Sequence, residues 1–333
     1  MPVSPISTFL RAASRQEGEK LNILCAPVHE AFESNWVKSG HNFYAFRSKN
    51  PGHKDWETKY RPVPDNYTLL PFDKIPLYTN FDLVVSHQKF GNFQTLLPVA
   101  KQLNLPFIQV EHTLPAPFWD EGRRETMTQM RGDINVFITE YSIKQWRFEF
   151  TPDVKVIRHC IDTDLFKPSK KERKNIILSV VNDWINRDWC CGFKVWQRVT
   201  QGLPVAPVGE TTGLSRAAKS IEELVSFYQQ SKVFINTSTV SPIPTSLLEA
   251  MSSGCACVST NNCAIPEYIE HGVNGFITND EKEMREYLEL LLKDDKLAEQ
   301  LGNNARKTIE EKCNVQRFTQ EWNEVFNEAL SFC

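Results

Sequence analysis

The sequence predicts an α/β fold of two Rossmann-like, doubly wound domains, each a parallel sheet covered by helices. Apolar strand-like runs alternate with helix-like segments along the chain, and a polar stretch at 167–175, KPSKKERKN, separates two halves with the same rhythm. At 333 residues the chain can bury two cores of ordinary size. Because ligands of such sheets bind at the carboxyl ends of the strands, two facing domains predict a binding cleft between them.

The expected strands are short runs rich in Val, Ile, Leu and Phe. In the first half they cover 21–27, 81–87, 106–112, 134–139 and 154–159. In the second half they cover 175–181, 204–209, 232–238, 256–260 and 275–279. Helices are expected over 93–104, 220–230, roughly 245–253 and 318–332. We place the first domain at 1–166 and the second at 167–317.

The composition is that of a globular protein and excludes several classes. Net charge is −3, which argues against an indiscriminate polyanion binder. No run of 18 apolar residues occurs, so no membrane span is expected, and the N-terminus has no pattern of a secretory signal. The nine cysteines are odd in number and form no CxxC pair, so zinc is poorly supported and a reduced, cytoplasmic protein is expected.

One isolated carboxylate, Glu249, stands in the apolar stretch 241–260, SPIPTSLLEAMSSGCACVST. Pro244 suits a helix start and Gly254 a helix end. The first turn would present the backbone N–H groups of Thr245, Ser246 and Leu247, which suit a phosphate oxygen. Glu249, one turn further on, could accept hydrogen bonds from two adjacent hydroxyls, as in a ribose. The alternative is an ordinary helix whose Glu249 faces solvent.

Longer motifs identify a family resemblance. PTSLLEAMSSGCACVSTNNCAIPEYIEHGVNGFITND and, earlier, VKVIRHCIDTDLFKPS resemble the signatures of the retaining family-4 glycosyltransferases of GT-B fold. Together these features resemble a subgroup with many phage-encoded or environmental members; a phage-encoded protein would be located in the host cytoplasm. The resemblance implies that the C-terminal helix, 318–333, crosses back to the N-terminal domain. It also implies that the N-terminal domain binds the acceptor and the C-terminal domain the nucleotide-sugar.

The resemblance assigns donor-site roles to individual residues. Glu249 takes the place of the acid that holds the nucleotide ribose, and Ser241 stands where the family has a second acid. Asn182 and Arg187 occupy the places of an Arg and a Lys that neutralise the diphosphate. His112 resembles a cleft histidine at the end of a strand, and is assigned with Arg187 to catalysis. The donor site would also include Ile243, Thr245, Ser246 and Leu247.

The implied reaction is a retaining transfer of a hexose or pentose from a nucleotide-sugar. The departing phosphate would take the acceptor's proton, so no carboxylate nucleophile is required. This agrees with the absence of the paired acids that glycoside cleavage uses. No cofactor is expected, since the nucleotide-sugar is a substrate, and no metal-binding cluster stands out.

A basic, aromatic stretch in the first half bears on the acceptor. Residues 36–61 hold six Lys/Arg against two acids, interleaved with Trp36, Phe43, Tyr44, Phe46, Trp56 and Tyr60. We predict acceptor contacts from Arg47, Lys49, Lys54, Arg123 and Arg124. Cations and stacking aromatics suit nucleic acid, so a hydroxymethylated DNA base, flipped out of its duplex, is the first acceptor hypothesis. The alternatives are an ordinary solvated loop, or a glycan, lipid or protein acceptor.

Two other activities remain open from the sequence. A sugar-nucleotide epimerase of the same fold would need acid and base side chains around the sugar. A non-catalytic nucleotide-binding module would explain the replacement of charged family residues by Ser241 and Asn182. A nicotinamide dehydrogenase is disfavoured, because no GxGxxG follows the first strand.

Overall fold

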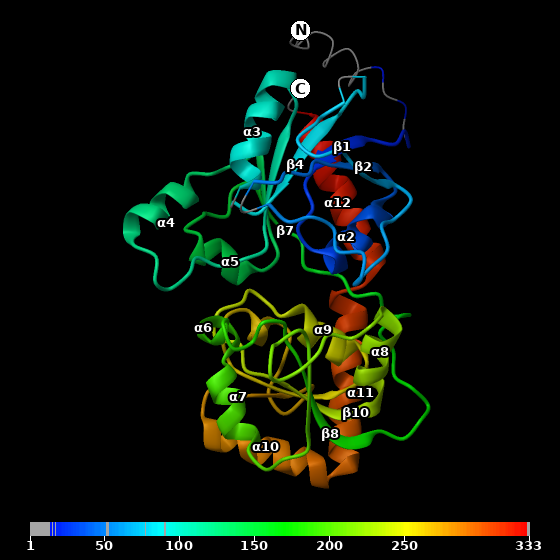
Figure 1. Cartoon of the computed structure of the whole chain (residues 1–333), viewed down its shortest axis with the longest axis vertical. Helices are drawn as coiled ribbons and strands as arrows, with labels where there is room; N and C mark the ends of the chain where they lie inside the picture. The colour runs from blue at the N-terminus through cyan, green and yellow to red at the C-terminus, as the bar shows by residue number, and fades with distance from the viewer. Residues whose placement is uncertain are drawn as a thin grey trace. The chain divides into compact units, whose positions relative to one another are not determined.

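The computed structural model divides into two compact units. It describes residues 14, 16, 18–50, 53–76, 78–89 and 91–331. The first unit comprises the described residues up to Arg158 and from Val315 onward, and the second is His159–Asn314 (Figure 1). The sequence predicts the division later, after 166. In the structure the division lies after Arg158, because residues 161 and 166 are bonded to the second unit. The Ile161 N–H donates to the Cys313 carbonyl, and the Phe166 carbonyl accepts from the Ser252 hydroxyl. The prediction that the N-terminus has no secretory signal concerns mainly residues 1–13, which lie outside the described residues.

Unit 1 contains one parallel sheet in the order β3-β2-β1-β4-β5-β6-β7. Its strands are β1 (Asn22–Cys25), β2 (Asn42–Ala45), β3 (Tyr67–Leu69), β4 (Leu83–His87), β5 (Phe107–Glu111), β6 (Ile134–Phe137) and β7 (Val154–Val156). Every residue of β4, β5 and β6 is buried, as expected for central parallel strands covered on both faces. The order reverses direction between β1 and β4, as in a doubly wound dinucleotide-binding sheet.

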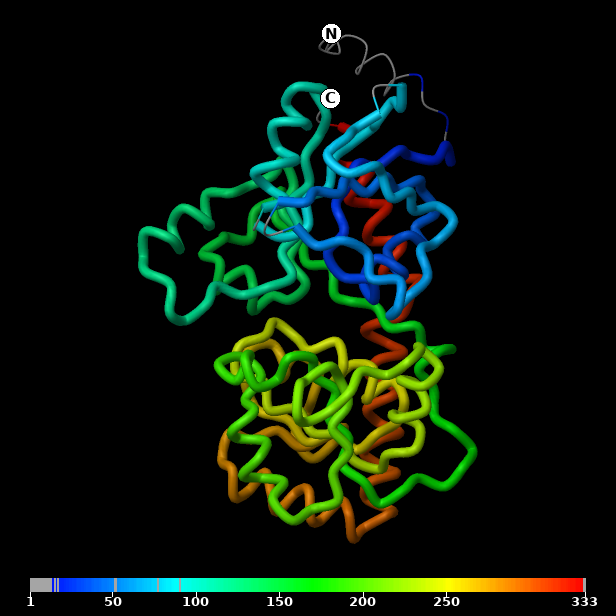
Figure 2. The backbone as a smooth tube through the Cα atoms, in the orientation of Figure 1, coloured from blue at the N-terminus to red at the C-terminus, as the bar shows by residue number. Residues whose placement is uncertain are grey.

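The helices of unit 1 include one from the far end of the chain. They are α2 (Glu30–Trp36), the 3₁₀ turn η1 (Val37–Ser39), α3 (Asn92–Leu103), α4 (Glu121–Thr128), α5 (Glu140–Gln145) and α12 (Val315–Leu330). The buried residues of α12 recur at helical spacing: Phe318, Trp322, Val325, Phe326 and Ala329. This stripe packs on α2 and η1, with the Trp322 and Trp36 ring centroids 5.5 Å apart. Figure 2 shows the red C-terminal helix beside the blue N-terminal segment.

Unit 2 is a second parallel sheet, in the order β12-β11-β10-β8-β9. Its strands are β8 (Lys174–Val180), β9 (Val205–Val208), β10 (Ser231–Asn236), β11 (Ala256–Ser259) and β12 (Phe276–Ile277). Its helices are α6 (Asp188–Cys191), α7 (Phe193–Thr200), α8 (Ile221–Gln230), α9 (Thr245–Ser252), α10 (Glu281–Lys293) and α11 (Asp295–Lys312), with a 3₁₀ turn η2 (Ile265–Glu267). When the five strands are numbered 1 to 5 along the chain and the sheet is read from β9, their order is 2-1-3-4-5, the other common doubly wound arrangement.

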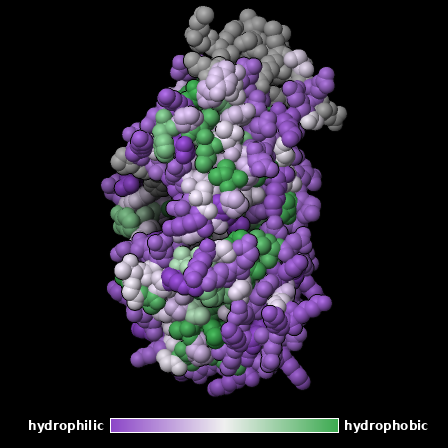
Figure 3. All heavy atoms as spheres, turned by 45° about the vertical axis from the view of Figure 1, so that its right-hand side comes forward, coloured by the Kyte–Doolittle hydropathy of each residue, from purple (hydrophilic) through white to green (hydrophobic). Residues whose placement is uncertain are grey.

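The predicted fold class is confirmed: both sheets are parallel, and each predicted strand overlaps an observed one, with β8 and β10 each beginning one residue earlier than predicted. The predicted helix at 318–332 is longer at its start, where α12 begins at Val315, and its residue 332 lies outside the described residues. The predicted linker at 167–175 ends sooner than expected, because β8 begins at Lys174. On the face in Figure 3, hydrophobic residues lie in scattered groups among hydrophilic ones.

Candidate functional site

The predicted donor residues lie at the carboxyl edge of the sheet of unit 2. The strand order reverses between β8 and β10, and ligands of doubly wound sheets bind at such a switch point. Asn182 and Arg187 follow β8, whereas Ser241 and α9 follow β10. The fold therefore brings both groups of predicted residues to two neighbouring loops at one edge of one sheet.

Helix α9 begins with two unpaired backbone donors. The N–H groups of Thr245 and Ser246 donate to no described residue, and both residues are half-exposed. The Leu247 N–H, also predicted to be available, donates to the Pro244 carbonyl at 3.1 Å. The side chains of Leu247 and Ile243 are buried in the interior of the unit. The anion-binding capacity of this helix start therefore resides in Thr245 and Ser246.

Glu249 is buried instead of lying on an exposed helix face. Its side chain is 5% exposed, and its Oε2 accepts a hydrogen bond from the Tyr228 hydroxyl at 2.9 Å. Tyr228, at the end of α8, is itself fully buried, and burial next to Glu249 raises its pKa well above the usual value. The tyrosine therefore stays protonated and fixes the carboxylate. The solvent-facing alternative weighed from the sequence is wrong.

The loop after β8 carries an exposed cation. Arg187 and Asn182 are both exposed, and an Arg187 guanidinium nitrogen donates to the Asn182 carbonyl at 3.3 Å. The Asn182 side-chain oxygen accepts from the Glu210 N–H at 2.9 Å, so the asparagine joins this loop to the one after β9. Asn182 thus braces the loop, and Arg187 supplies its positive charge.

Hydrogen bonds hold the loops after β8 and β10 together. The Cys190 carbonyl accepts from the N–H groups of Thr239 and Val240, at 2.9 and 3.2 Å. A Cβ on Gly192 would lie 2.1 Å from the Thr237 carbonyl oxygen, so only glycine permits this approach. Ser241 is half-exposed in the second loop, and its hydroxyl bonds to no described residue. The position of the Arg187 loop therefore depends on the loop that precedes α9.

In unit 1, two histidines meet at the ends of neighbouring strands. His112 follows β5, and its Nε2 lies 3.1 Å from Nδ1 of His87, the last residue of β4. His112 is half-exposed, whereas His87 is fully buried. His112 was predicted from the sequence, whereas His87 was not. A signal was present, since two predicted strands, FDLVVSH and PFIQVEH, both end in histidine.

The predicted acceptor cations are distributed over several elements and mostly engaged within unit 1. Lys54 forms an ion pair with Glu30 at 2.9 Å, and Arg47 donates to the Leu70 carbonyl at 2.8 Å. Lys49 lies over the Phe72 ring and Arg123 over the Trp119 ring, at 5.4 and 4.7 Å from the centroids. Arg124 donates to the Ala116 carbonyl at 3.2 Å.

The aromatic residues expected to stack on an acceptor belong largely to the core. Trp36 and Phe43 are 0% exposed, and Phe46 and Trp56 are also buried. They pack on other rings of unit 1; Trp36 and Phe43, for example, have centroids 4.4 Å apart. The prediction of a stacking surface at these four residues is therefore wrong. These aromatic side chains are part of the packed interior of unit 1.

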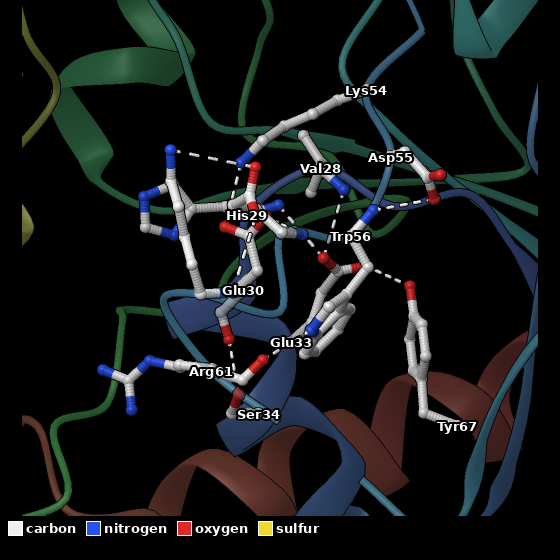
Figure 4. Close-up of polar contacts among 12 residues, drawn as sticks. Val28, His29, Glu30, Glu33, Ser34, Lys54, Asp55, Trp56, Arg61 and Tyr67 are labelled. Carbon is white, nitrogen blue, oxygen red and sulfur yellow. Dashed lines mark hydrogen bonds and ion pairs between the residues drawn. The ribbon is translucent and has the colours of Figure 1, made fainter. Parts of the chain in front are cut away.

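A buried carboxylate that the sequence did not reveal lies beside the end of β1. The Glu33 Oε2 accepts from the N–H groups of Val28 and His29, and its Oε1 accepts from the Tyr67 hydroxyl at 2.5 Å (Figure 4). Glu33 is 0% exposed, and burial raises its pKa from 4.5 to about 7, despite these hydrogen bonds. Its role is to hold the loop after β1.

This raised pKa predicts a loss of stability with rising pH. The unfolded chain releases the Glu33 proton near pH 4.5, whereas the folded protein retains it until about pH 7. The free energy of unfolding should therefore fall between these values, by about 2–4 kcal/mol for a shift of this size. In Glu33→Gln this part of the decline should disappear, as measured by urea unfolding at pH 5 and pH 8. Glu299→Gln, at an exposed position of α11, is the matched control. The assignment fails if Glu33→Gln keeps the full decline.

No helix among the described residues is both long and apolar enough to cross a membrane. No group of three or more His, Cys, Asp or Glu side chains among them is placed to hold a metal ion.

Comparison with known proteins relates this site to one family. Residues 217–308, which include α8 and α9, match the family model described as "Glycosyl transferases group 1". An N-acetyl-alpha-D-glucosaminyl L-malate synthase of Bacillus anthracis is 30% identical over 86 residues, 25% of this chain and 23% of that protein. The capsular polysaccharide biosynthesis glycosyltransferase CapM of Staphylococcus aureus is 28% identical over 114 residues, 34% of this chain and 30% of CapM. The chain thus spans less than a third of the length of these two relatives.

Solved structures resemble the chain over nearly its whole length. HepE of Anabaena, in complex with UDP, has a TM-score of 0.73 at 14% identity, covering 93% of this chain and 100% of HepE. Sucrose-phosphate synthase of Thermosynechococcus elongatus has a TM-score of 0.73 at 12% identity, covering 94% of this chain and 100% of the synthase chain. At these identities the likeness establishes the fold alone. The chain therefore has the GT-B glycosyltransferase fold, and a segment of its second unit is similar to the glycosyl transferases group 1 family.

Proposed function

We propose that this protein is a glycosyltransferase that moves a sugar from a nucleotide-sugar to an acceptor hydroxyl. The observation that carries the proposal is the buried, anchored Glu249 on α9, one turn after two unpaired N–H groups and within the segment matching the group 1 family. Burying a carboxylate is costly unless it is hydrogen-bonded, and the Tyr228 hydroxyl meets that requirement for Glu249. The position of Glu249 at the switch point of the sheet, where ligands of doubly wound folds bind, favours a role in binding over a role in packing alone.

The proposed chemistry follows from the charges at this edge. The N–H groups of Thr245 and Ser246 and the Arg187 guanidinium would bind the diphosphate, where negative charge grows as the sugar leaves. Glu249 would accept hydrogen bonds from the two ribose hydroxyls. We infer retention, with the departing phosphate taking the acceptor's proton, from the resemblance to retaining glycosyltransferases, in which Ser241 stands where the family has an acid. UDP is the first nucleotide to test, since UDP is bound in HepE.

For the acceptor, we propose a hydroxyl of a small molecule or glycan ahead of a DNA base. The names of two relatives refer to L-malate and to capsular polysaccharide. The hydroxymethylated DNA base predicted from residues 36–61 has less support than the sequence suggests, because four of the six aromatic side chains there are buried. Of the six, Tyr44 and Tyr60 are partly exposed, and the cations Lys49 and Lys54 of the same stretch are exposed. Mass spectrometry of hydroxymethylated DNA and of glycans incubated with the best donor distinguishes the two classes.

The donor proposal is tested by thermal shift against nucleoside diphosphates and their sugars. At a ligand concentration 100 times its Kd, the stabilisation should be about 2.7 kcal/mol. We expect one nucleoside diphosphate, UDP first, to stabilise the protein, and its sugar conjugate to be slowly hydrolysed. Stabilisation without hydrolysis or transfer would indicate the non-catalytic module, and interconversion of two nucleotide-sugars an epimerase. If no nucleoside diphosphate stabilises the protein, the proposal is wrong.

A further inference from the structure

The buried histidine at the end of β4 has no role in the chemistry described so far. Nδ1 of His87 lies 3.1 Å from Nε2 of His112, within hydrogen-bond distance. His87 is the last residue of β4, and His112 directly follows the neighbouring parallel strand β5, in a register that pairs His87 with Val110. The strands therefore hold both residues at the same edge of the sheet.

Aromatic packing fixes the ring of His87. Its centroid lies 4.7 Å from that of Trp36, at 88°, and 5.4 Å from that of Phe32, at 71°. Phe32 also packs edge to face on His112, with centroids 4.6 Å apart. Both imidazoles thus share one aromatic neighbour on α2, and the orientation of one ring is coupled to that of the other.

Burial also fixes the protonation of His87. Its side chain is 0% exposed, and desolvation lowers its pKa to about 3, so the ring is neutral at working pH. A single hydrogen then lies between His87 Nδ1 and His112 Nε2, which links the tautomers of the two rings. The Nε2 of His87 has no hydrogen-bond partner among the described residues. A hydrogen on that atom would be a buried, unpaired donor. The favoured tautomer of His87 therefore carries its hydrogen on Nδ1 and donates it to Nε2 of His112.

We propose that His87 is a positioning residue, which orients the His112 ring and holds it in a single tautomer. The consequence for turnover rests on the proposed function, since it requires His112 to take part in sugar transfer. The orientation of the His112 ring does not depend on the proposed function. A histidine that contacts a sugar hydroxyl must present either a donor or an acceptor, and a mixture of tautomers would leave a fraction of the protein unproductive.

The orientation is tested by long-range ¹H–¹⁵N NMR of the histidine rings in the ligand-free protein. We expect His112 to populate one tautomer in the wild type and both in His87→Phe, which removes the hydrogen bond and keeps an aromatic ring. In His87→Asn, whose amide places a polar group near the position of Nδ1, the single tautomer should return. Mixed tautomers in the wild type, or an unchanged tautomer in His87→Phe, would overturn the proposal.

The effect on turnover is tested by a double-mutant cycle. His87→Phe should lower kcat about 10- to 100-fold, the size of effect seen when a group that orients a metal-ligating histidine is lost, with partial recovery in His87→Asn. In a His112→Ala background, His87→Phe should cause no further loss, because its effect passes through His112. An equal loss in both backgrounds contradicts the positioning role. If the wild type transfers no sugar, the proposed function fails, while the NMR result still decides the orientation of His112.

Discussion

Glu249→Gln should weaken binding of the donor nucleotide on the order of 100-fold, through loss of charge-assisted hydrogen bonds worth about 1.5–3 kcal/mol each. The amide oxygen can still accept from the Tyr228 hydroxyl, which now donates to Glu249 Oε2 at 2.9 Å, so the fold should persist. The amide NH₂, however, cannot accept from a ribose hydroxyl. Titration calorimetry with the nucleoside diphosphate found by thermal shift measures the change.

Tyr228→Phe is the matched control for this prediction. It removes the hydroxyl that anchors Glu249 but leaves the carboxylate, so nucleotide affinity should fall much less than in Glu249→Gln. Both variants alter the same buried contact, and circular dichroism with a thermal melt reports whether the unit is intact. Equal affinity of Glu249→Gln and the wild type would remove Glu249 from the donor site. Equal losses in both variants would assign the effect to packing.

The regular part of the fold could be predicted from local sequence. The strands of both sheets are apolar runs, and the start of α9 follows from Pro244 and the sequence around it. The short strands β2 and β3 were missed: β2 lies within the stretch 36–61, which was interpreted as a basic, aromatic surface, and β3 has only three residues. In β2 the residues Phe43 and Ala45 are buried, whereas Asn42 and Tyr44 are only partly so. The interleaving of polar and aromatic residues there is the alternation of a strand.

The site was predictable only where it is local. Thr245, Ser246 and Glu249 were predicted from one helix and its start, whereas Arg187 was predicted from the resemblance to a glycosyltransferase family. The partners that hold the candidate site residues come from other parts of the chain. Tyr228 contacts Glu249 from α8, and His87 contacts His112 from the neighbouring strand β4. The engagement of the Leu247 N–H by the Pro244 carbonyl depends on the backbone angles of the turn, which residue types alone do not specify.

Arg187→Ala should lower kcat on the order of 100-fold, as expected when a group that stabilises transition-state charge is removed. The charge on the diphosphate grows as the sugar bond breaks, so the cation contributes more to the transition state than to binding of the intact donor. KM for the nucleotide-sugar should change much less than kcat. The side chain is exposed and its hydrogen bond to the Asn182 carbonyl is long, at 3.3 Å, so stability should hardly change. Steady-state kinetics with the best donor measures both constants.

Two further variants separate charge from geometry and from general surface effects. Arg187→Lys keeps the positive charge but loses the planar guanidinium, so its kcat should lie between those of the wild type and Arg187→Ala. Arg198→Ala, on α7, removes an exposed arginine that is paired with Glu281, and should leave kcat unchanged. If Arg187→Ala keeps the wild-type kcat, the loop after β8 does not stabilise the leaving group. The positive end of α9, at Thr245 and Ser246, would then have to supply that stabilisation.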